Sequence, residues 1–137
     1  MKEVIGIIGA GTMGAGIAQV AAQAGHQVIL VDQNQAQLDL AKANLEIILN
    51  KLLSKEKITI TQHASIASAI RYEVNNSSLA SCSLVIEAIV ENLAIKHSVF
   101  SSLEEIVSDT CILATNTSSL SIASIGSVLK NPSRIIG

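Results

Sequence analysis

The chain has 137 residues, of which 49% are apolar and 15% are charged, and its net charge is −2. This length suits one domain with a buried core, and this composition excludes a disordered chain. With one Tyr, one Phe and no Trp, the sequence offers neither a basic surface nor stacking side chains, so nucleic acid is not an expected partner.

The N-terminal segment 4–25 carries no charge and could be mistaken for a signal peptide or a membrane helix. It contains most of the chain's eight glycines, and a continuous helix would lose about 1 kcal/mol for each of them relative to alanine. We interpret it as a buried strand over Val4 to Ile8, a glycine turn, and a helix that Gly25 ends as a cap. The helical spacing is carried by Met13, Ile17, Val20, Ala21 and Ala24. No membrane partner is expected.

Strand-like and helix-like patterns alternate along the rest of the chain. Strands are predicted at 27–32, 70–74, 83–88, 111–115 and 134–136, the second of these from a weak pattern. Helices are predicted at 38–52, 93–107 and 121–129, with a loop and a short helix over 54–69. Such alternation indicates a parallel sheet with helices on both faces. We therefore predict an α/β fold of the Rossmann type, a doubly wound sheet with strand order 3-2-1-4-5-6 and ligands at the carboxyl ends of its strands.

The turn after the first strand has the pattern GxGxxG, which is typical of dinucleotide binding when a strand precedes it and a helix follows. Its residues are Gly9, Ala10, Gly11, Thr12, Met13 and Gly14. Gly9 permits the tight turn, Gly11 lets the backbone approach a pyrophosphate, and Gly14 lets the helix pack close to the strand. The helix N-terminus offers N–H groups and a positive dipole to the phosphates.

Asp32 ends the second strand, at the spacing where a carboxylate accepts hydrogen bonds from ribose hydroxyls. This carboxylate would repel the 2′-phosphate of NADP, and the next positive charge along the chain is Lys42. NAD is therefore the expected cofactor. The alternative is a purely structural glycine turn followed by an incidental aspartate.

The two cysteines, Cys82 and Cys111, lie far apart in apolar runs. Their spacing fits neither a redox pair nor a metal site, so we expect two buried thiols and no metal. Reduced thiols are consistent with a cytoplasmic location.

Three segments extend the argument beyond the cofactor: 4–32, which contains the glycine turn, 84–105, with LVIEAIVENLAIKHSVFSSLEE, and 112–122, with ILATNTSSLSI. With these segments the chain resembles the NAD-binding domain of 3-hydroxyacyl-CoA dehydrogenases, of the 3-hydroxybutyryl-CoA dehydrogenase type. The resemblance implies hydride transfer between NAD and the 3-hydroxyl carbon of a (3S)-3-hydroxyacyl-CoA.

The same resemblance assigns roles to individual residues. Glu91 and Lys96 would help to hold the cofactor, Ser118 would touch both nicotinamide and substrate, and Lys55 would meet the phosphates of coenzyme A. Each has a plainer interpretation: a solvated pair at a helix start for Glu91 and Lys96, capping for Ser118, and a solvated helix end for Lys55. Glu87 falls within a strand, so we expect a structural carboxylate with hydrogen-bond partners.

The family's general base is a histidine in a GLHFFNP-like segment after the sixth strand, with a glutamate further along. The sequence ends at Gly137, before such a segment. We therefore expect residues 1–137 to be a truncated NAD-binding domain without the catalytic histidine, its glutamate or the helical substrate and dimerisation domain. This chain would bind NAD with negligible turnover, and the full-length protein would be a homodimer that acts on acyl-CoA.

Two other functions are compatible with part of the pattern. Dehydrogenases of the 3-hydroxyisobutyrate and 6-phosphogluconate type also have a GxGxMG turn, although VIEAIVENLAIK and NTSSL argue against them. The second is a non-catalytic NAD-binding or structural protein, like the dehydrogenase relatives recruited as lens crystallins.

Overall fold

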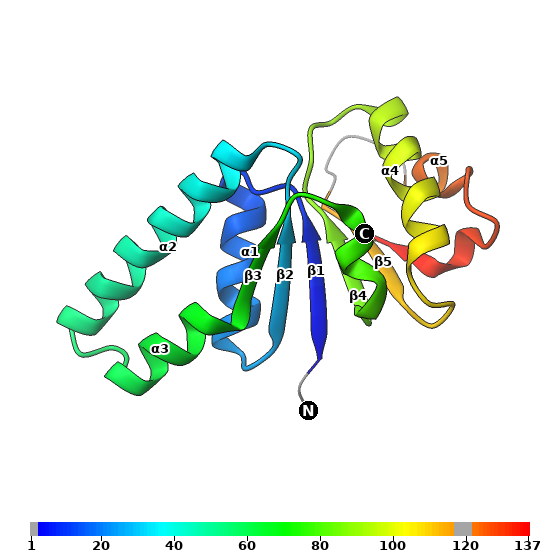
Figure 1. The fold of residues 1–137 in the computed structure, drawn as a ribbon. Coiled ribbons are helices and arrows are strands. Elements are labelled where there is room, and N and C mark those ends of the chain that lie inside the picture. Colours follow the sequence, from blue (N-terminus) through cyan, green and yellow to red (C-terminus); the bar gives the residue numbers. More distant parts are fainter. Residues whose placement is uncertain (1–2, 117–121) are drawn as a thin grey trace.

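The computed structural model describes residues 3–116 and 122–137, and in them six parallel strands form one sheet with helices on both faces (Figure 1). The strands are β1 (Val4–Ile8), β2 (Gln27–Val31), β3 (Ile70–Glu73), β4 (Leu84–Glu87), β5 (Ile112–Thr115) and β6 (Ile135–Ile136). The helices are α1 (Thr12–Gln23), α2 (Gln35–Ser54), α3 (Ile60–Ala69), α4 (Leu93–Ile106) and α5 (Ile122–Gly126), with 3-10 turns η1 (Asn76–Ser81) and η2 (Pro132–Arg134).

The strand order is β3-β2-β1-β4-β5-β6, so the predicted Rossmann topology is confirmed. β1 lies between β2 and β4, with Ile8 opposite Val31 on one side and Glu87 on the other. Because all the strands run the same way, the carboxyl ends of β1, β2, β4 and β5 lie at one edge of the sheet. This carboxyl edge is where the order reverses and where ligands of such sheets bind.

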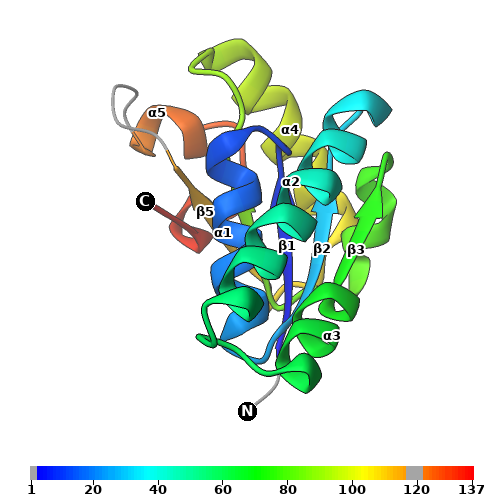
Figure 2. The same cartoon turned by 90° about the vertical axis from the view of Figure 1, so that its left-hand side faces the viewer.

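Alternate residues of the central strands enter two separate cores, as the period of a strand requires. Ile5 and Ile7 of β1 pack with α1, α2 and α3, which cover one face of the sheet (Figure 2). Ile8 packs on the other face with Phe100 and Leu103 of α4. Burial on both faces explains why these strands are continuous apolar runs.

Helix α1 uses a different face from the one that its apolar residues suggest. Met13 and Val20 are 59% and 66% exposed, which corrects the predicted inner face. The residues that it buries are Gly14, Ala18, Ala21 and Ala22. They are all small, because α1 packs too close to the sheet for longer side chains.

The segment between α2 and β3 contains a better-defined helix than the sequence indicated. α3 begins with a capping box in which the Thr59 side chain accepts a hydrogen bond from the Gln62 N–H and the Gln62 side chain accepts one from the Thr59 N–H. This reciprocal pair satisfies two N–H groups at the helix start.

The part of the chain that the structure describes has no helix long and apolar enough to cross a membrane. Within the same residues, no cluster of three or more His, Cys, Asp or Glu side chains could hold a metal ion.

Candidate functional site: a dinucleotide cradle at the carboxyl edge

The glycine turn has the geometry that its sequence predicts. Gly9 has φ +106°, and a Cβ there would lie 2.5 Å from the Ala88 carbonyl oxygen of the neighbouring loop. A Cβ on Gly14 would overlap the Gly9 carbonyl oxygen. These two positions therefore accept only glycine if α1 and β4 are to pack as they do.

Gly11 differs from the other two, because a Cβ there would meet nothing within 4 Å. It is the N-cap residue of α1 and gives the helix no side-chain cap. Among the described residues, the start of α1 is thus left for a bound anion, which the free N–H groups and the helix dipole favour. The turn fits a pyrophosphate: it is closed on the protein side and open on the side of Gly11.

Asp32 lies immediately after β2 and is bonded to this turn. Its Oδ2 accepts a hydrogen bond from the Ala10 N–H at 2.9 Å, and its Oδ1 accepts one from the Asn34 N–H at 2.9 Å. A carboxylate has about four acceptor positions, so two are left for ligand hydroxyls. The sequence placed Asp32 at this edge, and the structure adds that it also braces the turn.

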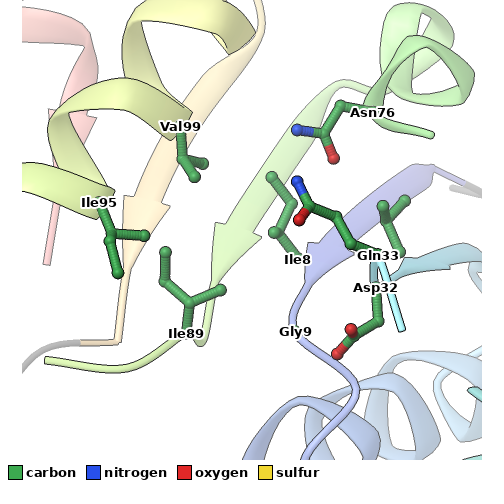
Figure 3. Close-up of a pocket in the computed structure, with 9 residues that line it drawn as sticks. Ile8, Gly9, Asp32, Gln33, Asn76, Ile89, Ile95 and Val99 are labelled. Carbon is green, nitrogen blue, oxygen red and sulfur yellow. The ribbon is translucent and has the colours of Figure 1, made fainter. Parts of the chain in front are cut away.

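A pocket of about 160 Å³ opens beside Asp32 (Figure 3). Its lining residues come from the ends of β1 and β2, from η1, and from the loop and helix after β4: Ile8, Gly9, Val31, Asp32, Gln33, Asn76, Ile89, Ile95 and Val99. Apolar side chains form its walls, and the Gln33 and Asn76 carboxamides lie at its rim (Figure 3). An apolar slot with a few polar groups is the usual form of a small-molecule site.

Sequence reasoning missed the walls of this pocket. Ile95 and Val99 are four residues apart on α4, a spacing that also describes the core face of an amphipathic helix. The available signal was their position in the first two turns of α4, the helix that follows β4 at the edge where ligands bind in this fold.

A buried cluster of charged groups lies where β4, β5 and α4 meet. Glu87 and Lys96 have no exposed surface, and Lys96 Nζ is 2.6 Å from Glu87 Oε2. The same Oε2 accepts a hydrogen bond from the Ile89 N–H at 2.7 Å, while the Thr115 hydroxyl donates to Glu87 Oε1 at 2.5 Å. Lys96 Nζ also pairs with Glu91 Oε1 at 3.3 Å. The prediction of a hydrogen-bonded Glu87 is thus confirmed.

The other predicted site residues lie in different surroundings. Glu91 borders the carboxyl edge with 37% of its side chain exposed, whereas Lys96 is enclosed rather than solvated. Ser118 lies outside the described residues; Asn116, two residues before it, donates its N–H to the Glu87 carbonyl at 2.8 Å. Lys55 caps the far end of the 20-residue α2, about 30 Å along the helix from the carboxyl edge.

None of the three histidines and neither of the two cysteines lines the pocket beside Asp32. His26 accepts a hydrogen bond from the Glu3 N–H, His63 contacts Asn50, and His97 Nε2 lies 2.6 Å from the Ser124 carbonyl oxygen. Both cysteines are buried and unpaired. Burial raises the pKa of the Cys82 thiol to about 11 and also raises that of Cys111, so neither is a ready nucleophile.

Comparisons with known proteins agree with this geometry. Residues 4–137 match the family described as 3-hydroxyacyl-CoA dehydrogenase, NAD binding domain. A probable 3-hydroxybutyryl-CoA dehydrogenase of Deinococcus radiodurans is 44% identical over 132 residues, and a 3-hydroxybutyryl-CoA dehydrogenase of Clostridioides difficile is 43% identical over 133. The crystal structure of 3-hydroxybutyryl-CoA dehydrogenase from Escherichia coli K12 superposes with a TM-score of 0.95 at 38% identity.

The matched region is almost all of this chain but only part of each relative. It covers 96% and 97% of the chain for the first two relatives and 47% of each of them. For the Escherichia coli structure it covers 97% of this chain and 28% of the other. The likeness therefore concerns the domain described above, and what the relatives do with the rest of their length is a separate question.

Proposed function

Since the chain belongs to the 3-hydroxyacyl-CoA dehydrogenase family and is its NAD-binding domain, we propose that the protein serves hydride transfer between NAD and the 3-hydroxyl carbon of a (3S)-3-hydroxyacyl-CoA. One observation carries the cofactor half of this proposal. The Asp32 carboxylate is hydrogen-bonded to the glycine turn and also borders the apolar pocket, so one side chain joins a phosphate cradle to a slot for a base.

The described residues offer separate places for three parts of NAD: the adenine, the adenosine ribose and the pyrophosphate. The walls formed by Ile8, Ile89 and Val99 suit the adenine ring, and Asp32 accepts hydrogen bonds from the adenosine ribose. The open face of Gly11 and the start of α1 suit the pyrophosphate. When bound, NAD supplies the hydride acceptor of the reaction. The family resemblance assigns Glu91 and Lys96 to holding the cofactor, and the position of Glu91 at the carboxyl edge supports this for Glu91.

The part of the proposal that concerns the substrate rests on the resemblance to the family. The resemblance assigns Ser118 to a hydrogen bond with the reacting oxygen, and Thr115, three residues before it, ends β5 beside Glu87. The resemblance alone assigns Lys55 to the phosphates of coenzyme A; Lys55 is exposed at the end of α2, away from the carboxyl edge. Relatives with the name 3-hydroxybutyryl-CoA dehydrogenase favour a short acyl chain.

The general base is proposed to come from outside residues 1–137. His26, His63 and His97 all bond to groups away from the pocket, so none is placed to take the proton of a substrate hydroxyl. The family's histidine and glutamate, together with its helical substrate domain, would complete the site. We accordingly propose that this chain binds NAD without substantial turnover. From the family resemblance we also propose that the complete protein is a homodimer and that it works in the cytoplasm.

The test compares the 137-residue chain with the product of the complete gene, by NADH absorbance. We expect the complete product to interconvert 3-hydroxybutyryl-CoA and acetoacetyl-CoA with NAD, and the chain alone to show negligible turnover. Preference for free 3-hydroxyisobutyrate or 6-phosphogluconate would contradict the acyl-CoA substrate. Substantial turnover by the purified chain would contradict the external base.

A further inference from the structure

Asn76 begins the 3-10 turn η1 and lines the pocket beside Asp32. The residue is half-buried, yet among the described residues its carboxamide has no hydrogen-bond partner. The cap position of η1 belongs to Asn75, whose carbonyl oxygen accepts hydrogen bonds from the N–H and the hydroxyl of Ser78. Folding therefore gives the Asn76 carboxamide no role.

The turn that carries Asn76 is anchored against the sheet. η1 contacts β1, β2 and α4. Leu79, three residues after Asn76, has no exposed surface and packs in the same core as Phe100. The backbone of Asn76 thus has a fixed place at the wall of the pocket, and a fixed backbone is a condition for a selective contact with a ligand.

The pocket has an apolar side and a polar side (Figure 3). Apolar side chains of α4 and of the loop after β4 form the first. Across from them Asp32, Gln33 and Asn76 lie in a row, with Asn76 at the end away from Asp32. If the adenosine ribose lies at Asp32, an adenine between the two sides presents to Asn76 the edge remote from the ribose. This edge carries the ring nitrogen N1 and the N6 amino group.

We propose that Asn76 recognises the adenine base of NAD: its Nδ2 donates a hydrogen bond to N1, and its Oδ1 accepts one from the N6 amino group. A carboxamide has a donor and an acceptor side by side, which is the pair that this edge of adenine requires. Gln33 is less suited, because it is exposed and directly follows Asp32 at the ribose end. The proposal rests on the placement of NAD proposed above and adds the residue that selects the base.

The main test compares NAD with 1,N6-etheno-NAD, in which a two-carbon bridge joins N1 and N6 of the adenine. The bridge removes both hydrogen-bonding groups and leaves the ribose, the pyrophosphate and the nicotinamide unchanged. Calorimetric titration of the purified chain should show etheno-NAD binding at least about tenfold weaker than NAD, because the Asn76 carboxamide then faces an edge that it cannot bond. Equal affinities for the two dinucleotides would overturn the inference.

Asn76→Ala shows whether Asn76 causes this preference. The change should weaken NAD binding about fivefold and leave etheno-NAD binding the same within about twofold, because only NAD loses hydrogen bonds. Asn75→Ala is the matched control: Asn75 is exposed and does not line the pocket, so the preference should stay complete. A preference that also stays complete in Asn76→Ala would mean that another group rejects the bridge, and it would overturn the inference.

A spectroscopic measurement on the unaltered chain serves if Asn76→Ala does not fold. In ¹⁵N–¹H NMR spectra, a Nδ2 proton signal of Asn76 should move downfield at saturating NAD and should not do so with etheno-NAD, because the hydrogen bond to N1 forms only with adenine. The Nδ2 signals of Asn75 should stay in place with both. Asn76 signals that respond alike to the two dinucleotides would overturn the inference.

The same titrations distinguish the inference from the proposed function. If the folded chain binds neither NAD nor etheno-NAD, the proposed placement of NAD is wrong and the inference falls with it. If the chain binds NAD and neither the bridge nor Asn76→Ala changes the affinity, only the inference is wrong.

Discussion

At the scale of single residues, the cofactor cradle depends on space that a side chain would fill. The three glycines of this turn differ in their surroundings. Gly9 has a positive φ, Gly14 packs against the backbone of the turn, and Gly11 faces open space. Only at Gly9 and Gly14 does the fold itself require glycine. We propose that the open space at Gly11 serves the cofactor, and substitutions should separate these roles.

Gly14→Ala should destabilise the fold, by about 1–3 kcal/mol, because its Cβ would overlap the Gly9 carbonyl. Gly11→Ala should cost less than about 1 kcal/mol, yet weaken NADH binding more than tenfold, because the methyl group occupies the path of the pyrophosphate. Urea unfolding and NADH titration measure the two effects.

Gly16→Ala is the matched control for the glycine substitutions. Gly16 is exposed within α1 and has open space around it, so alanine should stabilise the helix by up to about 1 kcal/mol and leave NADH affinity unchanged. Gly11→Ala that binds NADH normally would argue against a pyrophosphate at this turn.

Asp32→Asn tests the charge of the ribose site with little change in shape. The amide oxygen can accept only one of the two backbone hydrogen bonds that the carboxylate accepts, so the fold should lose about 1–2 kcal/mol while the chain stays folded. The preference for NADH over NADPH should fall about tenfold, because the negative charge that repels the 2′-phosphate is gone. An unchanged preference would show that Asp32 does not select the cofactor.

At the scale of elements, α1 shows how close packing overrides an apolar pattern. The helix faces the sheet with alanines and Gly14, while Met13 and Val20 point to solvent. The sequence pattern could not reveal this, because alanine counts little in a hydrophobic stripe and the distance between helix and sheet is a property of the packed structure. The same closeness brings the start of α1 up to the carboxyl edge.

Ala18→Leu should destabilise the chain by about 1–3 kcal/mol, because Ala18 is 1% exposed against the sheet and has no room for a larger side chain. Val20→Leu, on the exposed face of the same helix, should change the free energy of unfolding by less than about 0.5 kcal/mol. Similar losses in the two variants would contradict the observed inner face of α1.

A carboxylate links α4 to the segment that precedes β6. Glu104 accepts hydrogen bonds from the Lys130 N–H at 2.7 Å and the Asn131 N–H at 3.1 Å. Burial by itself would raise the pKa of Glu104, but these hydrogen bonds and the charges of Arg134 and Lys130 together hold it below its usual range. A lowered pKa means that the ionised form stabilises the fold, and that this stability is lost as the pH falls through the folded-state value.

Glu104→Gln should therefore lower the thermal midpoint at pH 7. The difference from the unaltered chain should persist down to about pH 5 and disappear in more acidic solution, since unfolded glutamate titrates near pH 4.3. Scans of thermal unfolding at several pH values measure it. A difference that grows on acidification would contradict the lowered pKa.

At the scale of the whole molecule, the sequence predicts the sheet and its binding edge better than the contacts between elements. The strand order follows from alternation, and Asp32 and Gly9 follow from spacing along the chain. The burial of Lys96 does not, because a lysine at a helix start normally lies in water. Its partner Glu87 is nine residues away on a strand, and only the packing of α4 against β4 brings the two together.

The most direct test of the central claim, that residues 1–137 form a working NAD-binding domain, is a fluorescence titration of the purified chain with NADH and with NADPH. The chain has no Trp, so the protein's own signal is small. We predict saturable NADH binding and an NADPH affinity at least about tenfold weaker. Equal affinity for the two cofactors, or no binding of either by the folded chain, would contradict the claim.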